Sequence, residues 1–96
     1  MENLNYGTFK VRIAELPDVI YSISGGVPYK ICSLQGDTLT IQRESTGSFV
    51  RLNIRELYEY FTKETIYNTQ TARKHITGYV YSPAAAVIKA LIKSKQ

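Results

Sequence analysis

Residues 28–54, "PYKICSLQGDTLTIQRESTGSFVRLNI", decide the fold of this chain. Apolar and polar residues alternate along three segments within it, residues 28–34, 38–44 and 48–54. An alternation with a period of two is typical of strands that bury one face. The pairs Gly36-Asp37 and Thr46-Gly47 separate the segments, and each pair suits a two-residue turn. The stretch therefore predicts a three-stranded antiparallel meander.

Two-residue turns at both places would also determine which residues pair. Ile41, in the middle segment, would face Cys32 on one side and Leu52 on the other. Both hairpins then place the same six residues on one face: Cys32, Leu34, Leu39, Ile41, Leu52 and Ile54. Because a slip of one residue would scatter this set, the agreement favours it as the core face. We therefore expect Cys32 to be a small core residue and not a nucleophile.

The opposite face of the predicted meander is mixed. It carries Tyr29, Ile31, Phe49 and Arg51 together with the other polar residues Ser33, Thr40, Gln42, Glu44 and Asn53. The three apolar side chains predict either that an N-terminal helix covers one corner of this face or that the corner meets a partner. Cover within the fold is the preferred interpretation, because single exposed apolar residues are common. A protein partner or a homodimer using this face remains one functional hypothesis.

An N-terminal helical region is predicted before the meander. Its apolar residues are spaced by four and three, which traces one face of a helix: Phe9, Ile13, Leu16, Ile20 and Ile23. Thr8 could cap this helix, and Gly25-Gly26 could end it. Pro17 should divide the region into two pieces, and residues 19–21 favour strand.

Two to three helices are predicted after the meander. Asn53 and Glu56 form a capping-box-like pair that would start the first helix. A short helix over residues 68–76 would stop before Gly78. Ser82 and Pro83 would start the last helix, which leaves residues 79–81 extended with one of two tyrosines packed inward. Residues 1–96 are thus expected to form a single α+β domain.

The charge of the chain is concentrated in its last third. The formal net charge is +4, and residues 65–96 contain five Lys or Arg residues but no Asp or Glu. A segment of one sign predicts an anionic partner, although a solvated helix face with a basic tail gives the same pattern. The sequence leaves both interpretations open.

The stretch "TARKHITGYVYSP", residues 71–83, combines basic and aromatic residues. This mixture suits phosphate contacts together with base stacking. The candidate anion-binding residues are Arg73, Lys74, Tyr79, Tyr81, Lys89 and Lys93. The leading hypothesis is therefore a small non-enzymatic module that binds nucleic acid or another polyanion. The alternative hypothesis is the protein-interaction or self-assembling domain that uses the outer sheet face.

Other kinds of site find little support in the sequence. One cysteine and one histidine, His75, make a metal cage unexpected, and we predict no metal or cofactor site. No phosphate-binding loop or nucleophile elbow is present, so an enzyme is the least favoured class. The N-terminus lacks the apolar stretch of a secretory signal, and no apolar run could span a bilayer. We expect a cytosolic protein without a membrane partner.

Overall fold

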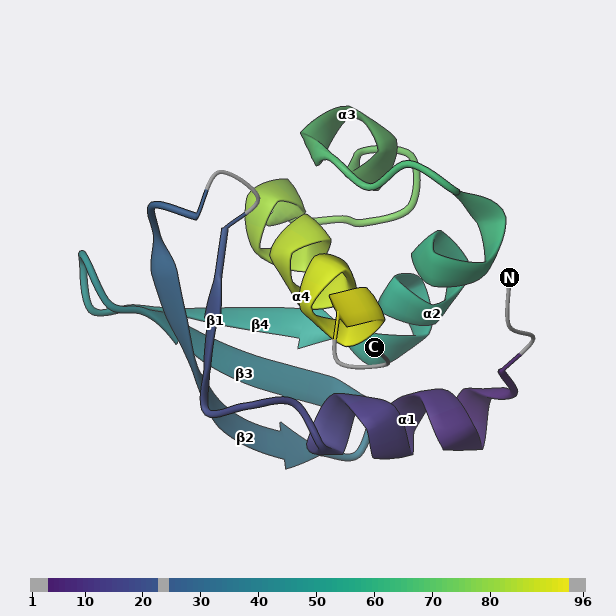
Figure 1. The fold of residues 1–96 in the computed structure, drawn as a ribbon, viewed down its shortest axis with the longest axis horizontal. Coiled ribbons are helices and arrows are strands. Elements are labelled where there is room, and N and C mark those ends of the chain that lie inside the picture. Colours follow the sequence, from purple (N-terminus) through teal and green to yellow (C-terminus); the bar gives the residue numbers. More distant parts are fainter. Residues whose placement is uncertain (1–3, 23–24, 94–96) are drawn as a thin grey trace.

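The computed structural model describes residues 4–22 and 25–93 as an α+β fold with an antiparallel sheet (Figure 1). Its elements, in chain order, are α1 (Tyr6–Ala14), β1 (Val19–Tyr21), β2 (Pro28–Gln35), β3 (Thr38–Arg43), β4 (Ser48–Asn53), α2 (Ile54–Lys63), α3 (Thr69–Ala72) and α4 (Tyr81–Lys93). The sheet has four strands in the order β1-β2-β3-β4. The predicted α+β class is confirmed, but the predicted number of strands is one too few.

The additional strand is β1, which replaces the second half of the predicted N-terminal helix. Helix α1 begins after Asn5, whose side chain accepts a hydrogen bond from the Thr8 N–H, so Asn5 and not Thr8 is the cap. The helix ends before Pro17, and Ile20 then pairs with Tyr29 of β2. β-branched and aromatic residues fit a sheet better than a helix, and pairing with β2 satisfies their backbone. The predicted helical position at residue 23 lies outside the described residues.

A β-bulge at Cys32 changes the predicted pairing of β2 with β3. Leu34 pairs with Leu39 as predicted, but further from the turn Ser33 pairs with Thr40 and Ile31 with Ile41. Cys32 has no pairing partner in β3, and its side chain is exposed. The predictions that it faces Ile41 and lies in the core are therefore wrong. One extra residue in a strand reverses the direction of the side chains beyond it.

The bulge moves two predicted interface residues to the inner face. Tyr29 and Ile31 now point to the same side as Ile41, and Tyr29 is only 2% exposed. The prediction that they lie on the outer face is therefore wrong. The physical reason is the difference in apolar area, because burying Tyr29 and Ile31 in place of Cys32 removes far more apolar surface from water.

The second hairpin has a four-residue loop, residues 44–47, in place of the predicted two-residue turn. Arg43 pairs with Ser48, and Ile41 pairs with Val50 and not with Leu52. The Gly47 N–H donates to the Arg43 carbonyl at 2.7 Å, and Gly47 supplies the positive φ of 75° that this turn needs. A shift of two residues leaves each side chain on its predicted face, so Leu52 stays in the core.

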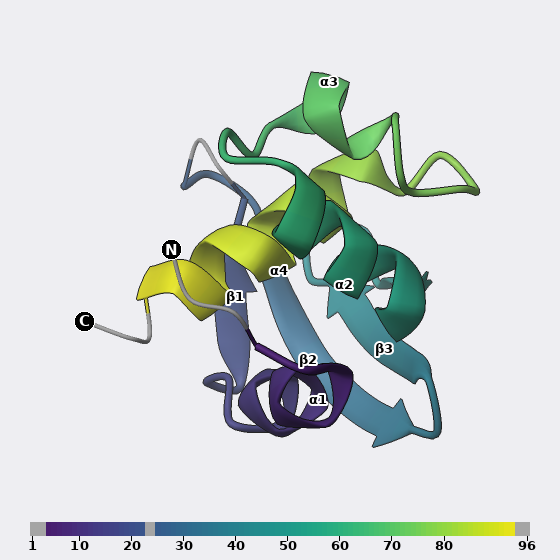
Figure 2. The same cartoon turned by 90° about the vertical axis from the view of Figure 1, so that its right-hand side faces the viewer.

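The core lies between the inner face of the sheet and helices α2 and α4 (Figures 1 and 2). Five consecutive residues of α4, 84–88, are buried, and the three alanines among them let the helix approach its neighbours closely. Helix α2 is capped by the Asn53 side chain, which accepts from the N–H groups of Arg55 and Glu56. Leu57 and Phe61 of this helix are buried.

A charged cluster around Asp37 joins α1, the β2–β3 turn and α2. The Tyr6 hydroxyl donates to the Asp37 carboxylate at 2.5 Å, and Lys10 and Arg55 each lie 3.6 Å from it. Burial, followed by the hydrogen bond to Asp37, raises the pKa of Tyr6 to about 12. The donated hydrogen bond is also the main cause of the lowered pKa of Asp37. The cluster fixes the position of α1 against the turn.

The bulge predicts unequal effects of two substitutions on the free energy of unfolding. Ile41→Ala should reduce it by about 2–4 kcal/mol, because Ile41 is completely buried and its loss leaves a cavity. Cys32→Ala should change it by less than about 0.5 kcal/mol, because Cys32 is exposed. Urea denaturation would measure both values. Similar losses at the two positions would show that Cys32 packs in the core.

The Asp37 cluster predicts how the free energy of unfolding depends on pH. The lowered pKa of Asp37 contributes stability above its ordinary value of 3.8, and this contribution is lost as the pH falls below that value. The raised pKa of Tyr6 contributes stability below 10.0, which is lost as the pH rises from 10.0 toward about 12. Tyr6→Phe removes the Tyr6 contribution and the largest cause of the Asp37 contribution, so the variant's loss of stability relative to wild type should be largest near neutral pH.

Thermal unfolding monitored by circular dichroism from acid to alkaline pH would test this expectation. Tyr79→Phe is the matched control, because it removes the same hydroxyl group from a side chain that is 90% exposed. A Tyr6→Phe deficit that stays constant across the whole range would contradict the assigned role of the hydrogen bond.

Candidate functional site

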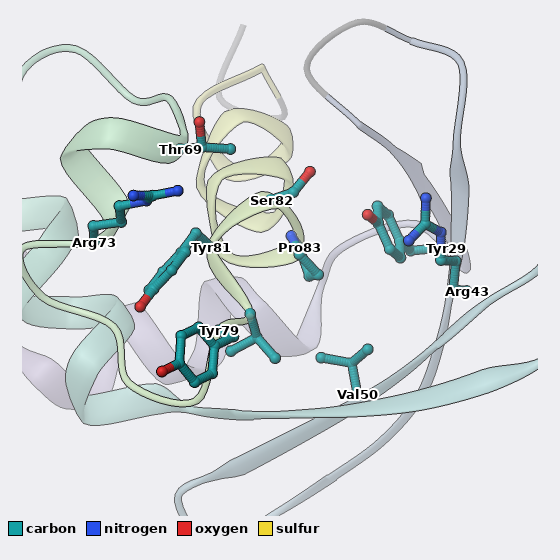
Figure 3. Close-up of a pocket in the computed structure, with 10 residues that line it drawn as sticks. Tyr29, Arg43, Val50, Thr69, Arg73, Tyr79, Tyr81, Ser82 and Pro83 are labelled. Carbon is teal, nitrogen blue, oxygen red and sulfur yellow. The ribbon is translucent and has the colours of Figure 1, made fainter.

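A cleft of about 380 Å³ opens where the start of α4 crosses the end of the sheet (Figure 3). The sheet contributes one residue from each of β2, β3 and β4, and the segment around α3 and the start of α4 contribute the rest. The lining residues are Tyr29, Arg43, Val50, Thr69, Arg73, Tyr79, Val80, Tyr81, Ser82 and Pro83. The cleft thus brings together segments that are far apart in the sequence.

The loop before α4 is held by Glu56 of α2. The Thr77 N–H and hydroxyl donate to the two carboxylate oxygens of Glu56 at 3.2 and 2.9 Å. This contact replaces the predicted return of Glu56 to its own helix cap. Gly78 and Tyr79 then adopt φ values of 86° and 61°, which turn the chain sharply toward α4. The left-handed conformation is strained for a tyrosine, and here it holds the Tyr79 ring out in solvent.

Helix α4 begins earlier than predicted. It starts at Tyr81, and the Ala84 N–H donates to the Val80 carbonyl at 3.1 Å. Ser82 and Pro83 therefore lie inside the first turn, and the prediction that residues 79–81 are extended is wrong. A proline is tolerated there because the first N–H groups of a helix have no partner within the helix.

The two tyrosines of this segment have different environments. Tyr81 is half-buried and packs against the core, whereas Tyr79 is exposed. Their rings meet edge-on with centroids 6.1 Å apart, and the Arg73 guanidinium lies 5.4 Å from the centroid of the Tyr81 ring. The prediction that one of the two packs inward is confirmed. The cation–π contact helps to direct Arg73 toward the cleft.

Arg73 follows directly after α3, and a polar cluster fixes that short helix. Asn68 and Thr71 form a reciprocal capping box. The Tyr60 hydroxyl lies 3.0 Å from the Asn68 carbonyl and 2.8 Å from the Thr71 hydroxyl. The ring of His75 stacks on Tyr60, and His75 Nε2 lies 2.8 Å from a carboxylate oxygen of Glu64. The only histidine of the chain is therefore engaged in a contact that anchors α3.

The cleft is positively charged. Figure 3 shows Arg43 and Arg73 on opposite sides of it, with Ser82 and Pro83 between them. Both arginines are exposed, and neither forms an ion pair with a carboxylate of the described residues. Hydroxyl groups of Thr69, Ser82 and the tyrosines complete the polar part of the lining, which includes no Asp or Glu. Such a site can hold an anion with guanidinium and hydroxyl donors.

The structure brings together only part of the predicted anion-binding set. Arg73, Tyr79 and Tyr81 line the cleft, whereas Lys74, Lys89 and Lys93 are exposed elsewhere. A helical rise of about 1.5 Å per residue puts Lys93 about 17 Å along the axis from Ser82. The predicted extension of the basic surface along α4 therefore does not reach the cleft.

Sequence reasoning missed Arg43 as a cleft residue. Arg43 pairs with Tyr29 in β2 and with Ser48 in β4, and this row belongs to the inner face of the sheet. The alternation of the middle strand could have indicated it, because Arg43 follows Leu39 and Ile41 at a spacing of two and therefore shares their face. Of the predicted protein-interface residues, Phe49 and Arg51 do lie exposed on the outer face.

The described residues hold no group of three or more side chains that could bind a metal ion. Among the same residues, no helix is both long enough and apolar enough to span a bilayer. Comparisons of the chain with protein-family models, with curated proteins and with solved structures found no significant match.

Proposed function

We propose that this chain is a small binding module that holds single-stranded nucleic acid in the cleft between Arg43 and Arg73. The observation that carries this proposal is the pair of unpaired guanidinium groups on opposite sides of one cleft without a lining carboxylate. Phosphate oxygens match the planar donors of arginine, often through two parallel hydrogen bonds. A phosphate between the two arginines would compensate two positive charges that form no ion pair with a carboxylate of the described residues.

The aromatic residues of the cleft favour a nucleic acid over a simple anion. Tyr79 lies at the edge of the cleft and is 90% exposed. The left-handed backbone conformation of Tyr79 leaves its ring free to stack on a base. Stacking of a base on an aromatic side chain contributes about 1–3 kcal/mol and tolerates any base. We therefore expect binding with little sequence preference.

The size of the cleft favours a single strand over a duplex. A volume of about 380 Å³ lies at the lower end of the range for small-ligand pockets, which is enough for about one nucleotide. A base can enter such a space and stack on Tyr79 only when it is unpaired. The start of α4 forms a wall of the cleft, and residues 84–88 are buried, so this helix does not project as a recognition helix would.

A binding role is also favoured over catalysis by the chemistry of the lining. No Asp, Glu, His, Cys or Lys lines the cleft, so the groups that most often transfer protons are not among its side chains. The nearby His75 has its Nε2 engaged by Glu64. This composition supports a non-enzymatic module.

A second candidate function is a protein-interaction or self-assembling surface on the outer sheet face. It keeps only Phe49 and Arg51 of its four predicted residues, because Tyr29 and Ile31 lie on the inner face. The exposed ring of Phe49, at 63%, is the observation that favours it.

The cleft predicts a specific loss of affinity for the double variant Arg43→Ala/Arg73→Ala. It should bind a labelled oligothymidylate of about ten nucleotides more weakly than wild type in a fluorescence-anisotropy titration. The slope of log K against log salt concentration should fall by about 1.4, since each phosphate contact contributes about 0.7 for a single strand. The fold should persist, because exposed charges contribute little to stability.

The matched control is Lys89→Ala/Lys93→Ala, which removes the same charge from an exposed surface away from the cleft. It should lower the affinity and the slope much less. Equal losses for both double variants would attribute binding to net charge alone. Absence of binding by the wild-type protein at low salt would refute the proposed function.

A further inference from the structure

The face of the sheet opposite α2 and α4 is open among the described residues (Figures 1 and 2). Most side chains of β2, β3 and β4 on this outer face are exposed, and Thr40 and Gln42 are partly exposed. The strand register arranges them in rows across the sheet. One row is Lys30, Gln42 and Phe49, and the next is Ser33, Thr40 and Arg51.

The strands that form the outer face carry charge of one sign. Strands β1 to β4 contain no Asp or Glu, whereas Lys30 and Arg51 are exposed cations on this face. The carboxylates next to the sheet lie outside its strands. Asp18 precedes β1, and its carbonyl accepts from the Ile31 N–H; Asp37 lies in the β2–β3 turn; and Glu44 follows β3, where its N–H donates to the Pro28 carbonyl. The face therefore complements an anionic partner, independently of the basic cleft on the inner side.

Aromatic rings stand at both edges of this face. Phe49 on β4 is 63% exposed, and Tyr21 on β1 at the opposite edge is 57% exposed. With strands about 4.8 Å apart, Lys30 lies about 10 Å from Phe49 across the sheet. A cation and an aromatic ring at such a spacing suit phosphate and base contacts along one strand.

The same features disfavour a second copy of this chain as the occupant. A symmetric dimer through this face would set two surfaces with the same strand cations, Lys30 and Arg51, against each other, and the strands supply no carboxylate to pair with them. The centre of the face is polar, at Thr40 and Gln42, whereas the core of a dimer interface is apolar. The observations thus favour a polyanion over a protein partner.

The outer face and the cleft meet around the β3–β4 hairpin. Arg43 and Val50 line the cleft, and their chain neighbours Gln42 and Phe49 point to the outer face. The Gln42 amide donates to the Gly47 carbonyl at 3.1 Å, which ties this row to the hairpin loop. A chain held in the cleft can therefore continue past the hairpin onto the outer row.

We propose that the outer face is a second segment of the nucleic-acid site, where a base of the single strand stacks on Phe49 and its phosphates contact Lys30 and Arg51. The ligand class rests on the proposed function, but the residues are separate from those of the cleft. Strands long enough to pass the hairpin should therefore bind more tightly than strands that only fill the cleft.

The first test compares Phe49→Ala with wild type in anisotropy titrations, using oligothymidylates of about four and about twenty nucleotides. Phe49→Ala should weaken binding of the longer strand about tenfold and leave the shorter strand unaffected, since one stacked base is lost. Phe49→Tyr should restore binding, because it keeps the ring. Ile66→Ala, which truncates an equally exposed apolar residue outside the sheet, should have no effect.

The second test uses Cys32 as a probe of the outer face. It is the only cysteine of the chain, and it is exposed at the bulge beside Lys30 and Ser33. The longer strand should slow its alkylation by iodoacetamide, an uncharged reagent, and protection should be lost in Lys30→Ala/Arg51→Ala. The shorter strand should give no protection.

The outcomes separate this inference from the proposed function. If the cleft variant loses affinity while Phe49→Ala binds both strands like wild type and Cys32 is unprotected, the outer segment is refuted and the cleft stands. If only the outer-face variants lose affinity, the outer segment is supported and the cleft is refuted. If light scattering shows a wild-type dimer that Phe49→Ala dissociates, the face is a protein interface and the inference is wrong.

Discussion

The β-bulge at Cys32 is the constraint on which the arrangement of the sheet depends. On the turn side of the bulge, Leu34 pairs with Leu39, and on the other side, Ile31 pairs with Ile41. All four side chains reach the inner face only because one residue between them is left without a partner. The bulge thus allows β2 to bury apolar residues along its whole length, at the expense of exposing Cys32.

The same bulge also determines the two surfaces of the sheet. Tyr29 becomes part of the cleft, where it pairs with Arg43, and Lys30 is placed on the outer face in the row of Phe49. Without the bulge, the side chains of Tyr29 and Lys30 would exchange faces. The cleft would then lose an aromatic wall, and the outer face would lose a cation.

Four carboxylates of the described residues are engaged in contacts with residues that do not line the cleft. Asp37 binds Tyr6, Lys10 and Arg55, and three glutamates have contacts of their own. Glu56 holds Thr77, Glu59 pairs with Lys63, and Glu64 contacts His75. Asp37, Glu56 and Glu64 join separate segments, whereas Glu59 and Lys63 pair within α2, and none of these four acids compensates Arg43 or Arg73. These acidic residues stabilise contacts within the fold, and the two arginines of the cleft keep their positive charge.

Local chemistry along the chain was enough to define several features. Alternation predicted the strands of the meander and the inner positions of Leu39, Ile41 and Leu52. Asn53 predicted the start of α2, and the basic and aromatic residues of 71–83 predicted Arg73, Tyr79 and Tyr81 as neighbours. These features depend on residues close in sequence, whose spacing alone determines which way they point.

Other features depended on contacts between distant segments, and only the folded structure could decide them. Residues 19–21 became a strand because β2 offered backbone partners, and Cys32 left the core because Tyr29 and Ile31 bury more apolar area. Arg43 joined the cleft because the segment around α3 and the start of α4 lie over its end of the sheet, and Glu56 left its own cap for Thr77. In each case the local sequence favours one conformation and a contact with a distant segment favours another. The contact determines the structure because it removes more apolar surface from water or satisfies more polar groups.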